Sequence, residues 1–203
     1  MNSKNKKGKI VIITGPSGVG KTTVAQGLLK NKNLNLKKVI TCTTRSKRPR
    51  ETEGKDYFFL TKKEFLKNIK NKEMFEYAEV YGNYCGSRKK DVKKILNSGG
   101  NVLFVIDVQG AFNLKNKNPE SKAIFLGAEN TDELKERLLK RKTDSRDVIK
   151  KRVDTALEEL KLADKLDYTV TNKKEKLQET INKIKNIIRN INKKEDKTNL
   201  SLD

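Results

Sequence analysis

The chain has 203 residues, a formal net charge of +21 at pH 7 and no histidine. This length fits one compact unit. No apolar run is long enough to cross a bilayer, and the N-terminal stretch MNSKNKKGK lacks the hydrophobic segment of a signal peptide, so we expect a soluble cytoplasmic protein with no membrane partner. Cys42 and Cys85 are the only cysteines and form no CxxC pair, which argues against a disulfide scaffold or a zinc site.

The positive charge admits two interpretations. Clustered lysines and arginines would indicate a nucleic-acid surface. Here the excess is spread along the chain among many Asn and Ile residues, and no basic block is interleaved with aromatic side chains. A general compositional bias explains the charge better, so we expect no nucleic-acid partner. The charge still produces a positive field that attracts small anionic ligands.

The predicted elements begin with residues 10–14, IVIIT, a continuously apolar and β-branched run typical of a strand buried on both faces. A second such run covers 102–106, and weaker ones cover 38–42, 123–126 and 168–170. Helical patterns lie between these runs. The sequence therefore predicts an α/β fold, a three-layer αβα architecture with a central parallel sheet.

Two helical patterns carry specific signals. Asn130 and Glu133 form a plausible capping box at the start of one helix. Near the C-terminal end, apolar residues recur at helical spacing, namely Leu177, Ile181, Ile184, Ile188 and Ile191.

Residues 44–90 interrupt the alternation of strands and helices. They contain an Arg-rich turn, the strand-like segments 57–60 and 75–81, and a capping box from Thr61 to Glu64. We interpret this stretch as a small inserted lobe, and the polar, basic stretch 140–155 as a short mobile lid. The remaining divisions are core segments 1–43, 91–139 and 156–192, and a tail, 193–203, that we expect to be disordered.

A glycine-rich loop follows the first strand and leads into a helix. It reads Gly15, Pro16, Ser17, Gly18, Val19, Gly20, Lys21, Thr22 and Thr23, and it matches the P-loop pattern. Glycines let several backbone N–H groups point inward at a phosphate, and the helix adds its positive N-terminal end. Lys21 then reaches the β- and γ-phosphates of ATP, and the Thr22 hydroxyl is a ligand for Mg²⁺. The alternative is a turn that only joins strand to helix.

A P-loop indicates a nucleoside triphosphate and little more, since GTPases, transporters and kinases all use one. From about residue 9 to 189, however, the chain resembles the guanylate kinase family. The matching segments are TTR at 43–45 with Pro49 and Arg50, GKDYFF at 54–59, FEYA at 75–78, GNY at 82–84 with Gly86 and Ser87, IDVQG at 106–110, and Arg137, Leu138, Arg141 and Arg152.

This resemblance implies that ATP and GMP or dGMP are the substrates and that the inserted lobe binds GMP. Arginine forks bind a monophosphate bidentately, so Arg45 and Arg48 are the candidates for it, with a hydroxyl donated by Tyr57. Guanine offers N–H donors and an acceptor, O6. The resemblance implies that Glu76 and Asp107 take the donors, while Ser87 and Thr41 bond around O6. Taken alone, each of these residues would be a solvated charge or a turn residue.

Catalysis in such a kinase comes from alignment and charge neutralisation. The residues that resemblance and chemistry assign to it are Lys21, Arg45, Arg137, Arg141 and Arg152. For the lid arginines the alternative is salt bridging on exposed helices. The resemblance also implies that Asn172 contacts adenine, although a structural role at a strand end fits that residue nearly as well. A monomer or a homodimer is expected.

Three departures from the family pattern are present, and two of them lead to predictions. Cys85 stands where relatives usually have a second tyrosine that reaches the acceptor phosphate, which predicts weaker GMP binding. Val105 stands where relatives commonly have a carboxylate. The usual Gly-Arg-Gly of the lid is Lys140-Arg141-Lys142, which predicts a stiffer hinge.

Three other functions fit parts of the sequence. Guanylate-kinase-like modules of scaffold proteins keep the fold and bind phosphorylated peptides, but they usually lose the phosphate loop, which is intact here. A kinase acting on a ribose bisphosphate would share the ATP loop and have no use for Glu76, Ser87 and Asp107. A nucleic-acid-binding protein would need a basic face.

Overall fold

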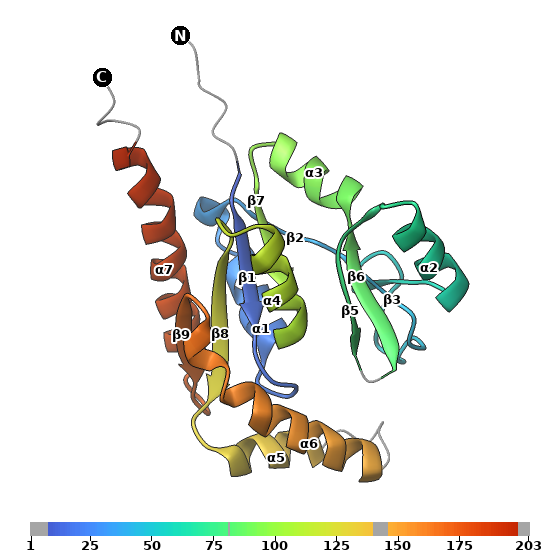
Figure 1. Ribbon diagram of the computed structural model, residues 1–203. Coiled ribbons are helices and arrows are strands. Elements are labelled where there is room, and N and C mark those ends of the chain that lie inside the picture. Colours follow the sequence, from blue (N-terminus) through green and yellow to red (C-terminus); the bar gives the residue numbers. More distant parts are fainter. Residues whose placement is uncertain (1–7, 81, 140–145, 199–203) are drawn as a thin grey trace.

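The computed structural model describes residues 8–80, 82–139 and 146–198, without the side chains of 138, 139, 146–151 and 193–198. A parallel sheet of five strands in the order β2-β7-β1-β8-β9 forms the centre of the molecule (Figure 1). Its strands are β1 (Ile10–Thr14), β2 (Leu36–Lys38), β7 (Asn101–Val105), β8 (Lys122–Ala128) and β9 (Tyr168–Asn172). The central parallel sheet predicted from the apolar runs is confirmed.

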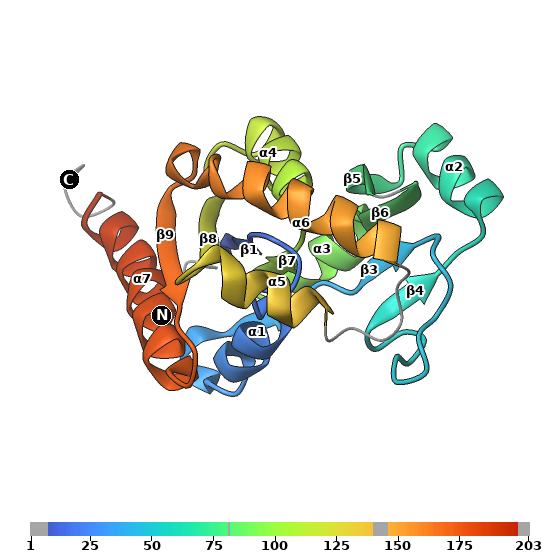
Figure 2. The same cartoon turned by 90° about the horizontal axis from the view of Figure 1, so that it is seen from below.

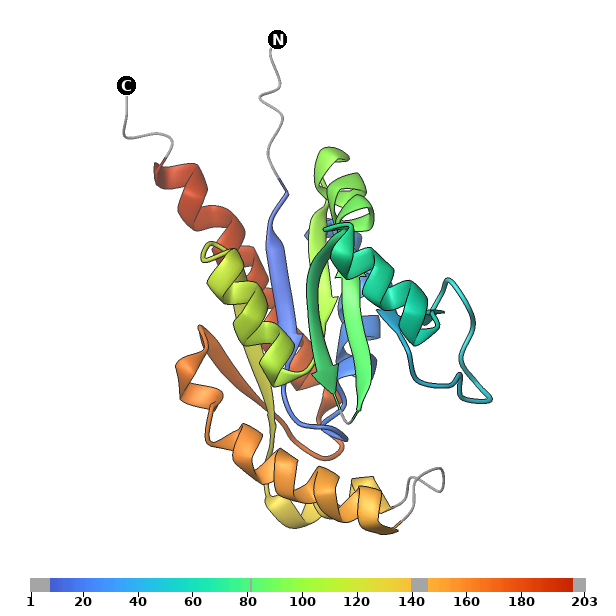
Figure 3. The ribbon, with the colours of Figure 1, turned by 45° about the vertical axis from the view of Figure 1, so that its right-hand side comes forward.

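Both faces of this sheet are covered by helices. Val11 and Ile13 of β1 pack with α1 (Lys21–Leu29) and α7 (Leu177–Thr198), whereas Ile12 packs with α3 (Lys89–Asn97) and α4 (Val108–Lys117). Alternate side chains of a strand point to opposite faces, so one apolar run serves two cores. Figure 3 shows α4 on one side of β1 and α7 on the other. The three-layer architecture is confirmed.

A second sheet, of four strands in the order β4-β3-β6-β5, lies beside the core. Its strands are β3 (Thr41–Thr43), β4 (Tyr57–Phe59), β5 (Met74–Val80) and β6 (Asn83–Arg88). With α2 (Lys62–Lys70) they enclose a small core around Cys42, Phe65 and Met74. The predicted capping box is present: the Thr61 hydroxyl accepts from the Glu64 N–H, and the Glu64 carboxylate accepts from the Thr61 N–H.

The passage from one sheet to the other differs from the sequence-based expectation. The run 38–42, predicted as one strand, is divided between β2, which ends at Lys38, and β3, which begins at Thr41. The small sheet therefore begins before residue 44, where we placed the lobe boundary. An apolar run indicates a buried segment but does not say at which residue the chain leaves one sheet and enters the next.

At the carboxyl end of the sheet, α5 (Thr131–Leu139) and α6 (Arg146–Leu160) pack against each other, and α6 crosses beside the loop that follows β1 (Figure 2). The Asn130 side chain accepts from the Glu133 N–H at 2.7 Å, which confirms the predicted cap of α5. Two short 3₁₀ turns, Lys32–Leu34 and Ala163–Lys165, complete the described elements. Helix α7 continues to Thr198, beyond the start of the tail expected at 193.

Within the described residues, no helix combines the length and the apolar character needed to cross a membrane.

Candidate active site

The loop after β1 has backbone conformations that favour glycine. Gly15 and Gly20 have φ angles of 132° and 97°, and a Cβ at Gly15 would lie only 2.2 Å from the Leu126 carbonyl oxygen. The loop thus packs directly on β8, and α1 begins at its end. Inside it, the Lys21 ammonium donates to the carbonyl oxygens of Gly15 and Pro16 at 2.5 and 3.0 Å. This arrangement holds a cation at the N-terminus of a helix, where phosphates bind favourably.

A cleft of about 180 Å³ joins this loop to the small sheet. The predicted site residues that line it are Gly15, Ser17, Lys21, Thr41, Tyr57 and Asp107. Cys85 and Val105, the two departures from the family pattern, line it as well. The fold therefore brings residues predicted for two different ligands, from two sheets, to the walls of one cavity.

Glu76 and Ser87 form a buried pair on neighbouring strands of the small sheet. The Ser87 hydroxyl donates to Glu76 Oε1 at 2.9 Å, and the two residues are 0% and 2% exposed, respectively. Burial raises the pKa of Glu76 to about 7, and repulsion by Asp107 adds to the rise, while the Ser87 hydrogen bond and Lys117 oppose it. A carboxyl in this setting is suited to accept the N–H donors of a base, because a ligand that supplies them offsets the desolvation of its charge.

Asp107 has a structural partner as well as a place in the cleft. Its Oδ1 accepts from the Gly110 N–H at 2.9 Å, which caps the N-terminus of α4. The cap fixes the residue at the point where β7 ends, on the side of the cleft next to Lys21.

Arg45 forms an ion pair with Glu51, a residue that the sequence analysis did not single out. Its guanidinium also lies 4.9 Å from the centre of the Tyr57 ring. Glu51 accepts a second hydrogen bond, 2.9 Å long, from the Arg48 backbone N–H. The same carboxylate thus organises the Arg-rich turn, and it raises the pKa of Arg45 by hydrogen bonding. An acid among Arg45, Arg48 and Arg50 is a signal in the sequence that could have identified it.

Cys85 lies opposite Thr43 on the paired strands of the small sheet, with 3.3 Å between Oγ1 and Sγ. Burial raises the pKa of the Cys85 thiol above its usual value, so the group is neutral at pH 7. The sulfur therefore offers only a weak donor where a tyrosine would offer a strong one.

The three lid arginines have different surroundings. An Arg152 Nη lies 3.5 Å from the Ser17 hydroxyl, which directs this side chain toward the phosphate loop. Arg137 forms a salt bridge with Glu133, one turn earlier on α5. Such a salt bridge on a helix is the alternative to a catalytic role for this residue. Arg141 lies outside the described residues. Catalytic roles for these arginines remain predictions.

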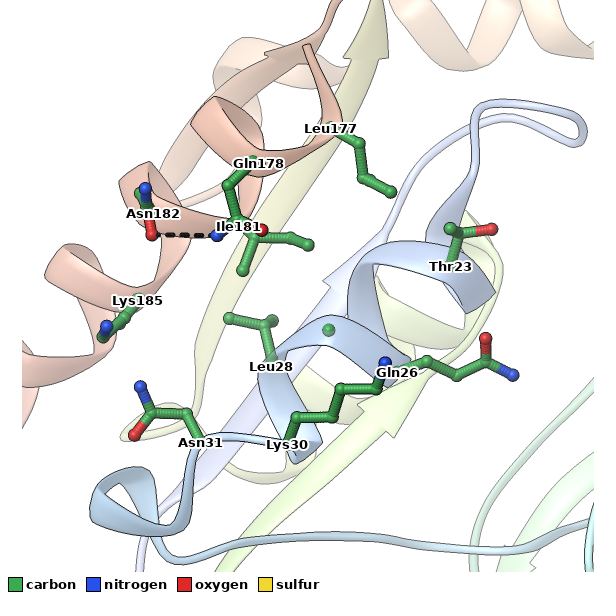
Figure 4. A pocket seen from close by; sticks show the side chains of 11 residues that line it. Thr23, Gln26, Leu28, Lys30, Asn31, Leu177, Gln178, Ile181, Asn182 and Lys185 are labelled. Atoms are coloured by element: carbon green, nitrogen blue, oxygen red, sulfur yellow. Dashed lines mark hydrogen bonds between the residues drawn. The ribbon is translucent and has the colours of Figure 1, made fainter. Parts of the chain in front are cut away.

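Asn172, at the end of β9, is buried and donates to the Val19 carbonyl at 2.8 Å. It therefore braces the phosphate loop. Its Oδ1 is buried and has no hydrogen-bond partner among the described residues, and the contact with adenine stays a prediction. Thr23, also predicted in the phosphate site, lines a different cavity of about 450 Å³ between α1 and α7, together with Leu28, Gln178 and Ile181 (Figure 4).

A magnesium ion fits this site only together with phosphates. The described part of the chain contains no cluster of three or more Cys, Asp or Glu side chains that could hold a metal. Thr22, exposed in the first turn of α1, supplies one hydroxyl beside Lys21. Mg²⁺ commonly takes few protein ligands and completes its octahedron with substrate phosphates and water, which matches this donor set.

Glu159 of α6 is a further acid in the cleft that the sequence analysis missed. Its position seven residues after Arg152 places both on one face of the helix, since two turns separate them. That spacing was a usable signal in the sequence.

Comparison with known proteins identifies the family. The guanylate kinase family model matches residues 7–191. A guanylate kinase of Fusobacterium nucleatum is 42% identical over 183 residues, which cover 90% of this chain and 97% of that protein. One from Streptococcus thermophilus is 42% identical over 168 residues, covering 83% and 80%. The crystal structure of guanylate kinase from Anaplasma phagocytophilum superposes with a TM-score of 0.75 at 34% identity, covering 91% of this chain and 86% of that one.

The phosphate loop and the small sheet line one cleft, and the family model and the relatives match most of the chain; the chain therefore belongs to the guanylate kinase family, the P-loop kinases that phosphorylate GMP with ATP.

Proposed function

We propose that this chain binds ATP with Mg²⁺ at the loop 15–23 and GMP or dGMP against the small sheet, and transfers the γ-phosphoryl group directly between them. The observation that carries the assignment is the shared cleft, in which Lys21 of the loop and Tyr57 of the small sheet line one cavity. Direct in-line transfer requires donor and acceptor to lie in contact, and a common cavity satisfies that requirement.

Mg²⁺ held by Thr22 and the ATP phosphates would neutralise charge on the phosphates. Lys21 adds a second positive charge on the loop side. Arg152, already directed toward Ser17, adds a third from α6. Phosphoryl transfer passes through a loose transition state in which positioning and charge neutralisation supply most of the rate enhancement, so no histidine or nucleophile of the protein is needed.

GMP binding would exchange partners at Arg45. Its guanidinium is paired with Glu51, so the acceptor phosphate must either displace that carboxylate or use the donor positions that remain on the fork. Because the ion pair and Tyr57 already fix the guanidinium, little side-chain entropy is lost on binding.

Glu76 would select the base. Guanine presents N–H groups that a carboxylate can accept, whereas the same edge of adenine lacks them. A wrong base would leave a buried carboxylate without its donors, and sites of this kind reject analogues strongly.

An assay of ADP formation tests these assignments, with GMP, dGMP, AMP, UMP and CMP supplied in turn. We expect turnover with GMP and dGMP at a kcat/KM at least about 100-fold above that for the other nucleotides. Equal turnover with AMP would contradict the role of Glu76. The absence of turnover with every acceptor would favour a binding module instead.

Two coarser assignments accompany this proposal. We place the chain in the cytoplasm, where both nucleotides are available, and we expect a monomer or a homodimer. Light scattering of the purified chain with and without nucleotides distinguishes these two states, and a larger assembly would contradict both.

A further inference from the structure

Glu159 is placed where α6 passes over the reaction cleft. It lines the 180 Å³ cleft together with Lys21 and Asp107, and also an adjoining cavity of about 370 Å³ with Glu79 and Gln109. Figure 2 shows α6 running from the side of β9 across the phosphate loop toward the small sheet. The residue thus lies near the C-terminal end of α6, beyond the stretch 140–155 interpreted as the lid, and lines the cleft.

The charges around Glu159 come from three other elements and from α6 itself. Lys21, at the start of α1, attracts its carboxylate, and Asp107, at the start of α4, repels it. Glu79 of β5 shares the adjoining cavity, and Arg152 lies two turns earlier on α6. Burial is the largest influence and raises the pKa of Glu159 to about 7. An acid that lies among other acids, in a cleft for anions, requires a reason to be there, and the cation facing it is Lys21.

The Lys21 ammonium interacts with its own loop and with Glu159 of α6. Two carbonyl oxygens of its own loop, those of Gly15 and Pro16, accept from the ammonium. These contacts draw the side chain back onto the loop. The Glu159 carboxylate of α6 lines the same cleft and attracts the ammonium as well.

We propose that Glu159 is a positioning residue of the transfer reaction, which acts through Lys21: its carboxylate draws the ammonium toward the cleft and so couples the position of helix α6 to the readiness of the phosphate loop. The inference rests on the proposed function in one respect, since Lys21 is taken to contact the phosphates. With α6 in its present position, the Glu159 carboxylate faces the cleft. A displacement of α6 would move this carboxylate away from Lys21.

Glu159→Gln tests the charge at nearly constant shape. We expect kcat to fall about tenfold while the KM for ATP changes by less than about threefold. The reason is that a misplaced Lys21 weakens stabilisation of the transition state more than it weakens binding of ATP in the ground state. Glu158→Gln is the matched control: it removes the adjacent acid of the same helix, which is exposed and paired with Lys161, and should leave kcat unchanged. An unchanged kcat in Glu159→Gln overturns the proposal.

A double-mutant cycle separates action through Lys21 from a structural role. In a Lys21→Ala background, assayed with radiolabelled ATP because turnover is slow, Glu159→Gln should have less than about a twofold further effect. A tenfold effect in both backgrounds would show that Glu159 supports the fold and would overturn the proposal.

Glu159→Asp provides a second variant if the Gln variant fails to fold. It keeps the charge and should retain at least about a third of the parent kcat. A loss as large as that of Glu159→Ala would overturn the proposal. The parent chain is assayed in parallel, so that failure of GMP phosphorylation itself is distinguished from failure of this inference.

Discussion

The two sheets of this kinase offer phosphates different kinds of proposed site. In the parallel sheet, the loop after β1 presents its main chain, shaped by glycines that pack on β8. In the small sheet, the side chains of Arg45 and Tyr57 are fixed by Glu51 and by each other. A site made of backbone tolerates most sequence change provided that its glycines remain, whereas a site made of side chains changes with each substitution. Under the proposed function, we therefore expect substitutions in the small sheet to change the specificity for the acceptor.

The electrostatic settings of the two sites also differ. The loop site has an ammonium supported by neutral carbonyls. The base site has a buried carboxyl supported by a hydroxyl, next to a second acid. A pH change near neutrality therefore acts on the acceptor side through Glu76, and on the donor side through Glu159, whose pKa is also about 7.

The largest effect is expected on the donor side, at Lys21. Lys21→Ala removes the one side-chain cation built into the loop, and kcat should fall by about 10³-fold. GMP affinity, measured by calorimetry, should stay within about twofold, since the two sites use separate groups. Lys30→Ala is the control, because that lysine lies just beyond the end of α1, away from the loop. Equal losses of ATP and GMP affinity would remove the distinction between the two sites.

An intermediate effect is expected at Glu76. Glu76→Gln should raise the KM for GMP roughly 10- to 100-fold, as expected for loss of a hydrogen-bonded charge, and leave the KM for ATP unchanged. The parent KM for GMP should also rise as pH falls from 8 to 6. Guanine donors favour the ionised carboxyl, and the pKa of about 7 means that protonation competes with binding below neutrality.

Two comparisons make the Glu76 experiment specific. The variant should lack the pH dependence, since its amide does not titrate in this range. Glu73→Gln, at an exposed acid before β5, should retain it. Identical pH profiles for the parent chain and Glu76→Gln would contradict the assignment.

The smallest effect is expected at Cys85. Cys85→Tyr adds the hydroxyl donor that this chain lacks, and the KM for GMP should fall about tenfold, the gain typical of a hydrogen bond to a charged group. Cys85→Phe adds the ring alone and should not produce that gain. If both variants bind GMP equally well, or if neither improves on the parent chain, the acceptor phosphate lies elsewhere.

Much of the donor site could be predicted from the sequence, because its parts are contiguous. The run IVIIT, the glycine pattern and the following helix specify strand, loop and helix without reference to distant residues. The acceptor site could be predicted only by family resemblance, because Thr41, Glu76 and Asp107 come from different elements that the fold brings together.

The contacts that side chains make were the least predictable features. The ion pair of Arg45 with Glu51 and the hydrogen bond of Asn172 to Val19 depend on side-chain direction, which the spacing of residues does not specify. The division of 38–42 between two sheets escaped prediction for a related reason. Only Lys38 of the run belongs to β2, and the tertiary arrangement, not the apolar pattern, decides where one strand ends and the next begins.

That division limits how the acceptor lobe can move. Only Val39 and Ile40 separate the two sheets, and the Val39 N–H is anchored to the Leu103 carbonyl at 3.0 Å. A pivot at this crossing would fall on Ile40, immediately before Thr41. An outward rotation of the small-sheet lobe would then move Thr41 away from the guanine of the proposed GMP site. Opening of the cleft and release of the nucleotide would therefore occur in the same motion.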